Sequence, residues 1–168
     1  MNPAVVLLSA VTAERLAELW WARRNTAALL ARGASEFAAG HYPAIVLLHA
    51  LWLSSLWIFG WGRPIGSGWL AVFLALQVLR VWILATLGRR WTTRIVVLPG
   101  APLVAVGPYR VLSHPNYLVV VGEIATLPLC FGLPWLSLLF SLANAGILSV
   151  RIRAENVALT GSLNVGHR

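Results

Sequence analysis

The sequence has no aspartate, no lysine and a single cysteine, Cys130. Without aspartate it cannot form a Ser-His-Asp triad, and one cysteine cannot form an intrachain disulfide. It also has no Walker loop and no G-x-G-x-x-G motif, so a soluble nucleotide-binding fold is not indicated. Clustered cysteines and a helical pair of histidines are missing as well, and we therefore expect no metal site.

Apolar residues dominate what is present. They make up 59% of the 168 residues, and the mean hydropathy is +0.78. This composition predicts an all-α, polytopic membrane protein that forms one domain over residues 1–168. The formal charge of +8 does not indicate nucleic acid binding, because the arginines stand at the ends of apolar runs. We expect the lipid bilayer as a partner and no nucleic acid.

About five membrane-spanning helices are predicted. The segment 116–150 carries one charge, Glu123, and as a single helix it would extend roughly 52 Å at about 1.5 Å per residue. The hydrocarbon core is only about 30 Å thick, so this segment has to turn back, and Gly132-Leu133-Pro134 suits the turn. The predicted spans are therefore 3–22, 42–61, 69–87 and the two arms of a C-terminal helical hairpin.

The arginines predict the orientation. With the N-terminus outside, ten arginines lie in cytoplasmic segments and only Arg63 lies outside, as the positive-inside rule requires. We expect a bacterial inner-membrane protein with three N-terminal spans (1–88), a cytosolic connector (89–115) and the hairpin (116–155). Its C-terminus and its site would face the cytosol.

Two loops are expected at the cytosolic side. Asn25 would close the first helix, and residues 26–41 would form an amphipathic connector in which Arg32 and Glu36 pair four residues apart. The second loop contains β-prone runs at 95–98 and 104–106, and we expect it to lie over the site.

Several polar residues fall inside the predicted spans, where charges usually face a bundle interior or a cavity. Glu14, Arg15 and Glu18 either form a structural ion pair or line a site, and the lone His49 is more typical of a hydrogen-bonded structural histidine. Arg80 either snorkels to the interface or meets a partner, and Glu123 needs a partner such as Arg80 or Arg15. The candidate substrate-lining residues are Gln77, Arg80, Glu123 and Asn144.

Further polar residues converge at the cytosolic ends of the hairpin. The turn Gly107-Pro108-Tyr109 lets the backbone approach a ligand closely, and His114 precedes a helix that begins at Pro115. Arg151 and Glu155 are four residues apart on the last helix. That pair can position a cation, hold a substrate proton or bind each other, and we take both as candidate catalytic residues.

These motifs resemble a known family. GPYRxxxHPxY followed by RIxxE is similar to the isoprenylcysteine carboxyl methyltransferase family of membrane enzymes. The stretches ERLAEL, GASEFAAGHYP and LRVWILATLGRRW resemble a bacterial branch that methylates long-chain polyketides such as alkylpyrones and alkylresorcinols. The chain departs from the family pattern at Ser113 and Asn156, which leaves the acceptor open.

The resemblance implies S-adenosylmethionine as cofactor, entering from the cytosol, and a prenyl or alkyl acceptor entering from the bilayer. The transfer would go to an oxygen of an isoprenylcysteine-type carboxylate or of a long-chain polyketide enol or phenol. The implied cofactor-binding residues are Gly107, Pro108, Tyr109, His114, Pro115, Asn116, Tyr117 and Glu155.

Two other functions stay open. Steroid-type membrane reductases that use NADPH have a similar HPxY-like element and hairpin, although their longer C-terminal region is missing here. A noncatalytic membrane protein or small transporter would use the same polar cluster only for structure.

Overall fold

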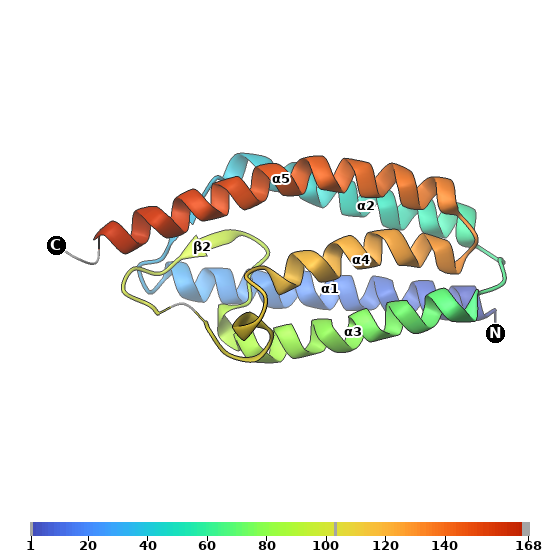
Figure 1. The fold of residues 1–168 in the computed structure, drawn as a ribbon, viewed down its shortest axis with the longest axis horizontal. Coiled ribbons are helices and arrows are strands. Elements are labelled where there is room, and N and C mark those ends of the chain that lie inside the picture. The colour runs from blue at the N-terminus through green and yellow to red at the C-terminus, as the bar shows by residue number, and fades with distance from the viewer. Residues whose placement is uncertain (1, 103, 166–168) are drawn as a thin grey trace.

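The computed structural model describes residues 2–102 and 104–165, and these fold into a bundle of long helices with one small sheet (Figure 1). The five helices are α1 (Pro3–Leu30), α2 (Tyr42–Gly60), α3 (Ser67–Leu87), α4 (Pro115–Cys130) and α5 (Pro134–Val165). The two strands are β1 (Ser35–Phe37) and β2 (Ile95–Val97), and short 3-10 segments are η1 (Ala39–His41), η2 (Gly88–Arg90) and η3 (Gly107–Arg110).

Three helical segments in the described residues are long and apolar enough to cross a membrane: Ala39–Gly60, Ser67–Arg90 and Pro134–Glu155. The α4 helix is apolar but has only 16 residues, and α1 carries charges in its middle. The prediction of an all-α membrane protein is confirmed, with the small sheet as its only strand pair in the described part of the chain.

The predicted end of the first helix is wrong. The α1 helix passes through Asn25 and ends at Leu30. Gly33, three residues later, has a φ of +87° in the turn that follows. The stretch after Asn25 is rich in alanine and leucine, which favour helix. The side chain of Asn25 is bound by the segment that follows α3. Its side-chain amide donates to the backbone carbonyls of Gly88 (3.1 Å) and Trp91 (2.8 Å).

The hairpin prediction is confirmed. The α4 helix ends at Cys130 and α5 begins at Pro134, with Gly132 between them at a φ of +65°. The Leu133 backbone N–H donates to the Pro128 carbonyl at 3.0 Å, which closes the turn. Because the two helices run back along each other (Figure 1), their far ends come together.

The sheet was only half predicted. The run at 95–98 does form a strand, but its partner Ser35–Phe37 was not expected, and 104–106 is not a strand. The pairing is antiparallel, with Glu36 opposite Val96. The predicted Arg32–Glu36 pair is wrong because residues 35–37 are extended instead of helical, and Glu36 pairs with Arg94 at 2.9 Å.

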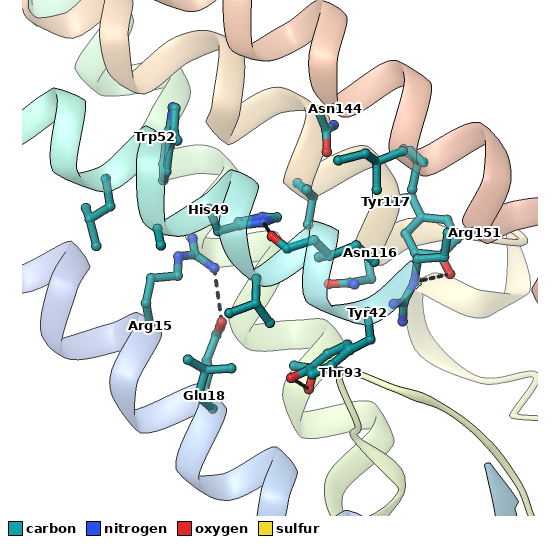
Figure 2. A pocket seen from close by; sticks show the side chains of 18 of the residues that line it. Arg15, Glu18, Tyr42, His49, Trp52, Thr93, Asn116, Tyr117, Asn144 and Arg151 are labelled. Carbon is teal, nitrogen blue, oxygen red and sulfur yellow. Dashed lines mark hydrogen bonds and ion pairs between the residues drawn. The ribbon is translucent and has the colours of Figure 1, made fainter. Parts of the chain in front are cut away.

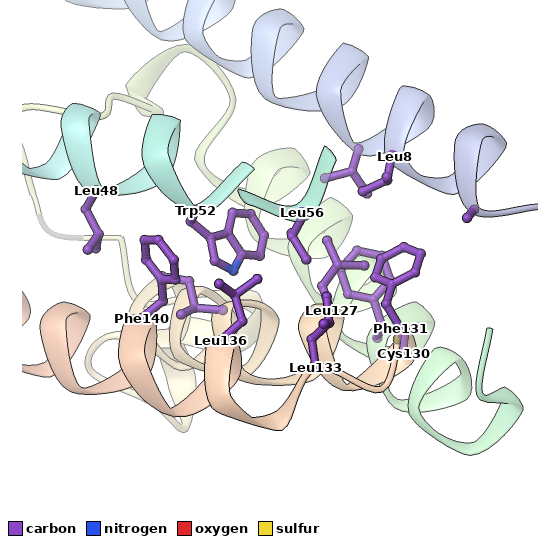
Figure 3. Close-up of a cluster of buried hydrophobic side chains, with 14 residues drawn as sticks. Leu8, Leu48, Trp52, Leu56, Leu127, Cys130, Phe131, Leu133, Leu136 and Phe140 are labelled. Atoms are coloured by element: carbon purple, nitrogen blue, oxygen red, sulfur yellow. The ribbon is translucent and has the colours of Figure 1, made fainter. Parts of the chain in front are cut away.

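The main hydrophobic core lies between α1, α2, α4 and α5, with Phe73 added from α3 (Figure 3). Trp52 is 1% exposed and packs among large apolar side chains from the hairpin helices. The core residues labelled in the figure are Leu8, Leu48, Trp52, Leu56, Leu127, Cys130, Phe131, Leu133, Leu136 and Phe140. This core holds the hairpin against α2.

The two ends of the bundle differ in character. The N-terminus, the α2–α3 turn and the hairpin turn lie at one end (Figure 1). The sheet, the loop before α4 and the C-terminal part of α5 lie at the other end, which holds most of the arginines. The polar residues of the hairpin therefore meet beneath the sheet.

Candidate functional site

A buried charge network ties α1, α3 and α4 together. Arg80 on α3 is 3% exposed, and its Nε donates to Oε1 of Glu123 at 2.7 Å. Its Nη2 makes a second bond to the same carboxylate, and its Nη1 donates to both oxygens of Glu18 at 3.0 Å. Arg80 therefore meets partners and does not snorkel to the interface.

Arg15 and Gln77 complete this network. Arg15 donates to Glu18 at 3.0 Å and to Glu123 at 2.8 Å, and Gln77 Nε2 donates to Glu123 at 2.8 Å. The hypothesis that Glu123 pairs with Arg80 or Arg15 is confirmed for both arginines. Burial of these charges is tolerable because each one has several partners.

An apolar cavity of about 300 Å³ lies beside the network (Figure 2). We call it the apolar chamber. Helices α1, α2, α4 and α5, Arg80 of α3 and the loop after α3 form its walls. Its lining residues are Thr12, Arg15, Leu16, Glu18, Leu19, Tyr42, Ile45, Val46, His49, Ala50, Trp52, Leu53, Arg80, Trp91, Thr92, Thr93, Asn116, Tyr117, Val120, Asn144, Ile147, Leu148 and Arg151.

A second, more polar cavity of about 580 Å³ lies beneath the sheet and the loop that follows it. We call it the polar cavity. It is lined by Leu29, Arg32, Leu87, Arg90, Trp91, Thr92, Arg94, Ile95, Val96, Val97, Leu98, Ala101, Pro102, Val104, Ala105, Tyr109, Ser113, His114, Asn116, Tyr117, Arg151 and Glu155. The expectation that the 89–115 connector lies over this region agrees with that lining.

The two cavities share five residues: Trp91, Thr92, Asn116, Tyr117 and Arg151. We call these residues the shared wall. They come from the start of the connector, the first turn of α4 and the middle of α5. A molecule in the apolar chamber and a molecule in the polar cavity would therefore meet at the same few side chains.

Tyr117 is the centre of the shared wall. Its hydroxyl donates to a carboxylate oxygen of Glu155 and accepts a hydrogen bond from Nε of Arg151 at 3.0 Å. His114 stacks on the Tyr117 ring with 5.1 Å between ring centroids. Within the described residues Arg151 and Glu155 form no direct ion pair. Of the alternatives that their spacing left open, direct pairing is therefore absent, and Tyr117 links the two side chains.

Tyr109 lines the polar cavity from the η3 turn. Burial, with a smaller contribution from the nearby Glu155 carboxylate, raises the pKa of Tyr109 from 10.0 to about 12. Its hydroxyl is therefore protonated at neutral pH. Tyr109 can act as an aromatic wall and a hydrogen-bond donor, but it cannot act as a general base.

Not every predicted cofactor residue reaches the polar cavity. Gly107, Pro108 and Pro115 are outside its lining. Pro108 and Pro115 are buried in the packing, and Gly107 has a φ of +57° with its Cα against Thr86 of α3. These three residues instead shape the two turns that carry Tyr109 and His114.

This position predicts a difference between two glycines of the connector. An alanine Cβ at Gly107 would lie 2.6 Å from Oγ1 of Thr86, whereas one at Gly100, also at positive φ, would meet nothing within 4 Å. Gly107→Ala should lower the free energy of unfolding more than Gly100→Ala, which carries only a backbone penalty of about 1–2 kcal/mol. Thermal unfolding in detergent measures both, and equal losses would show that the contact with Thr86 has no effect.

The predicted substrate-lining residues divide into two groups. Arg80 and Asn144 line the apolar chamber, whereas Gln77 and Glu123 lie behind it in the charge network. Ser113 lines the polar cavity, and the side chain of Asn156 lies outside the described part of the chain.

Sequence reasoning missed some wall residues. Tyr42, Trp91 and Thr93 line the chamber, and the Tyr42 hydroxyl is 3.0 Å from Oγ1 of Thr93. They stand at or just outside span ends, where tyrosine and tryptophan are expected anyway as interface anchors. His49 lines the chamber as well, beyond its predicted structural role.

Comparison with known proteins gives the family of the chain. The model of the isoprenylcysteine carboxyl methyltransferase (ICMT) family matches residues 69–161, more than half of the chain. The chain belongs to this family. The match covers α3, the connector and both arms of the hairpin, which supply most of the polar cavity and the whole shared wall. ICMT membership identifies the protein as a membrane methyltransferase.

A relative in Bacillus subtilis (strain 168) extends the likeness over the N-terminal helices. The chain is 42% identical to the protein YpbQ, described as uncharacterized, over 159 residues. The aligned part covers 92% of this chain and 95% of YpbQ, so the two have nearly the same extent. No solved structure matches the chain.

Proposed function

We propose that the protein transfers a methyl group from S-adenosylmethionine to an oxygen of a lipophilic acceptor. The donor would bind in the polar cavity, and the acceptor would bind in the apolar chamber. The single observation behind this proposal is that the two cavities share Asn116, Tyr117 and Arg151. A donor that enters from water and an acceptor that enters from the lipid can therefore meet at these side chains, while each stays in its own cavity.

The polar cavity suits S-adenosylmethionine in size and chemistry. Its volume of about 580 Å³ falls within the about 300–1,000 Å³ typical of small-molecule sites. Tyr109 and His114 offer aromatic faces, the Glu155 carboxylate complements a cationic centre, and arginines such as Arg32 and Arg90 can bind a carboxylate. The residues present therefore fit the donor.

When bound, S-adenosylmethionine supplies an electrophilic methyl group: an O–CH₃ bond forms as the S–CH₃ bond breaks, and that electron pair stays on sulfur. The chain's own task is to align two molecules and exclude water. Tyr117 is held by both Arg151 and Glu155, so the wall where the reacting atoms would meet is fixed from α4 and α5 at once.

Proton handling depends on the acceptor. A carboxylate is already ionised at neutral pH and needs no base. An enol or phenol has to lose a proton, and Glu155 would accept it directly or through a water molecule. Arg151 would stabilise the resulting oxyanion as a charge-assisted donor, which assigns the two candidate catalytic residues different roles.

The apolar chamber suits the acceptor's hydrophobic part. Its walls are mostly aliphatic and aromatic, and its charges are paired among themselves. It lies between helices that are apolar enough to sit in a bilayer, so an alkyl or prenyl chain could reach it from the lipid. We propose the cytosolic membrane face for the polar cavity, in accordance with the arginine distribution.

The direct test uses purified protein in detergent with methyl-labelled S-adenosylmethionine. One reaction contains a long-chain phenol, a second contains an S-prenylated cysteine, and a third replaces the donor with NADPH. We expect label in a lipophilic product with at least one acceptor and no NADPH oxidation. No binding of the donor by calorimetry, together with no labelled product, would contradict the proposal.

Substitution of His114 tests the donor side. His114 stacks on Tyr117 and lines only the polar cavity, so His114→Ala should weaken donor binding and reduce transfer to background at low donor concentration. Saturation curves for S-adenosylmethionine and for the acceptor separate the two effects. His41→Ala is the matched control because His41 lines neither cavity, and wild-type turnover in His114→Ala would reject the assignment.

A further inference from the structure

Most polar side chains of the apolar chamber are paired with each other. Arg15, Glu18 and Arg80 belong to the charge network, and Tyr42 is paired with Thr93 at 3.0 Å. These groups have little left to offer a ligand. A lipophilic molecule in the chamber would meet them mainly as a closed polar surface.

Nε1 of Trp52, Nε1 of Trp91 and Nε of Arg15 are buried without a hydrogen-bond partner among the described residues, but each of these groups can only donate. Asn116 belongs to the shared wall. His49 and Asn144, which lie on different helices, carry groups that can also accept. Asn144 on α5 is 4% exposed, and its amide has no hydrogen-bond partner among residues 2–102 and 104–165. Nδ1 of His49 on α2 is 2.9 Å from the Ile45 carbonyl. A carbonyl can only accept, so Nδ1 donates and the neutral ring leaves Nε2 as an acceptor, for which the described chain provides no partner.

The amide of Asn144 and Nε2 of His49 therefore stay available to a ligand in the chamber, which could supply their hydrogen-bond partners. Both side chains line the same chamber (Figure 2). This arrangement is typical of a binding pocket that is mostly apolar but has a few polar groups that fix orientation.

Their depth in the bundle can be read from the helices. His49 is seven residues after Tyr42, and Asn144 is seven residues before Arg151. Helices α2 and α5 lie side by side and run in opposite directions (Figure 1). Seven residues correspond to about 10 Å of helix, so both side chains lie about 10 Å from the end of the chamber that holds Tyr42 and Arg151.

We propose that His49 and Asn144 form a second recognition point, which binds a neutral hydroxyl group on the acceptor about 10 Å from the oxygen that is methylated. A hydroxyl suits both partners because it can donate to Nε2 of His49 and exchange hydrogen bonds with the Asn144 amide. The inference rests on the proposed function, since it takes the chamber to hold the acceptor. His49 and Asn144 would set acceptor specificity without touching the transferred methyl group.

The test is a binding series on the full chain in detergent. The ligands are long-chain phenols that carry one additional hydroxyl at successive positions of the alkyl chain, and the reference is the phenol without it. Calorimetry should show one position, about 10 Å from the phenol oxygen, that binds about tenfold more tightly than the reference, as expected for one or two added hydrogen bonds.

Three variants separate recognition from packing. Asn144→Leu and His49→Phe should each lose the tenfold advantage and still bind the unsubstituted phenol as tightly as the wild type. Ser141→Ala should retain the advantage, because Ser141 lies one turn earlier on α5 and lines neither cavity. A flat series in the wild type, or an advantage that persists in both variants, would overturn the inference.

Methyl transfer is measured separately on the same ligands. If one positional isomer binds tightly through His49 and Asn144, but the donor does not bind and neither the phenols nor the prenylated cysteine is methylated, the second recognition point stands and the proposed function fails. If phenols are methylated but no position is preferred in binding, the proposed function stands and the second recognition point is wrong.

Discussion

Replacing Glu155 with glutamine is expected to lower the turnover number for a long-chain phenol by about 10²- to 10⁴-fold, the usual contribution of a general base. Glutamine can still accept the hydrogen bond that the Tyr117 hydroxyl gives to Glu155, so the shared wall should keep its shape. What is lost is the carboxylate that receives the phenol proton. The measurement is the initial rate at saturating S-adenosylmethionine.

The control for this variant is Glu36→Gln. It removes the same charge from a carboxylate that pairs with Arg94 and lines neither cavity, and it should leave turnover within a factor of about two, since exposed pairs contribute little. If Glu155→Gln also retains wild-type turnover with the phenol at saturating donor, then Glu155 is not the base.

The same variant distinguishes acceptor classes. With a prenylated cysteine the acceptor carboxylate is already ionised, so Glu155→Gln should affect the donor's KM more than the turnover number. Comparing the two acceptors in one variant therefore separates proton removal from donor binding.

The sequence predicted the hairpin because its evidence was local. A charge-poor segment too long for one crossing and a Gly-Leu-Pro turn leave few alternatives, and the turn then brings Tyr117 and Arg151 together. The network partners of Glu123 were predicted for a similar reason: few cations lie at membrane depth, so Arg15 and Arg80 were the available candidates.

Other features depend on contacts between distant segments. Nothing in residues 35–37 indicates a strand until Ile95–Val97 lies beside them, so the sheet and the Glu36–Arg94 pair were missed. The position of Tyr117 between Arg151 and Glu155 was also missed. Helical spacing identifies neighbours within one helix, and it cannot show that a third side chain from α4 lies between them. The apolar chamber is lined by side chains from all five helices and was not predictable at all.

The largest effect on stability is expected for Glu123→Ala. Glu123 accepts hydrogen bonds from Arg80, Arg15 and Gln77 and is 2% exposed. Its removal leaves Glu18 as the main carboxylate for the buried Arg80 and the partly buried Arg15. Breaking a buried ion pair on one side typically costs about 3–5 kcal/mol, a large share of the about 5–15 kcal/mol that stabilises an ordinary domain.

The matched variant removes both charges. In Arg80→Leu/Glu123→Leu the Arg15–Glu18 pair at 3.0 Å remains, so no guanidinium group loses all its partners. The double variant should therefore be more stable than the sum of its single changes predicts, by about 2 kcal/mol or more. Denaturant unfolding in detergent micelles measures Glu123→Ala, the double variant and its two single variants. The reference is Glu36→Ala, which removes a partly exposed carboxylate and should cost about 0–1 kcal/mol. If Glu123→Ala lost no more stability than that reference, the charge network would not hold α1, α3 and α4 together, and the walls of the apolar chamber would need another support.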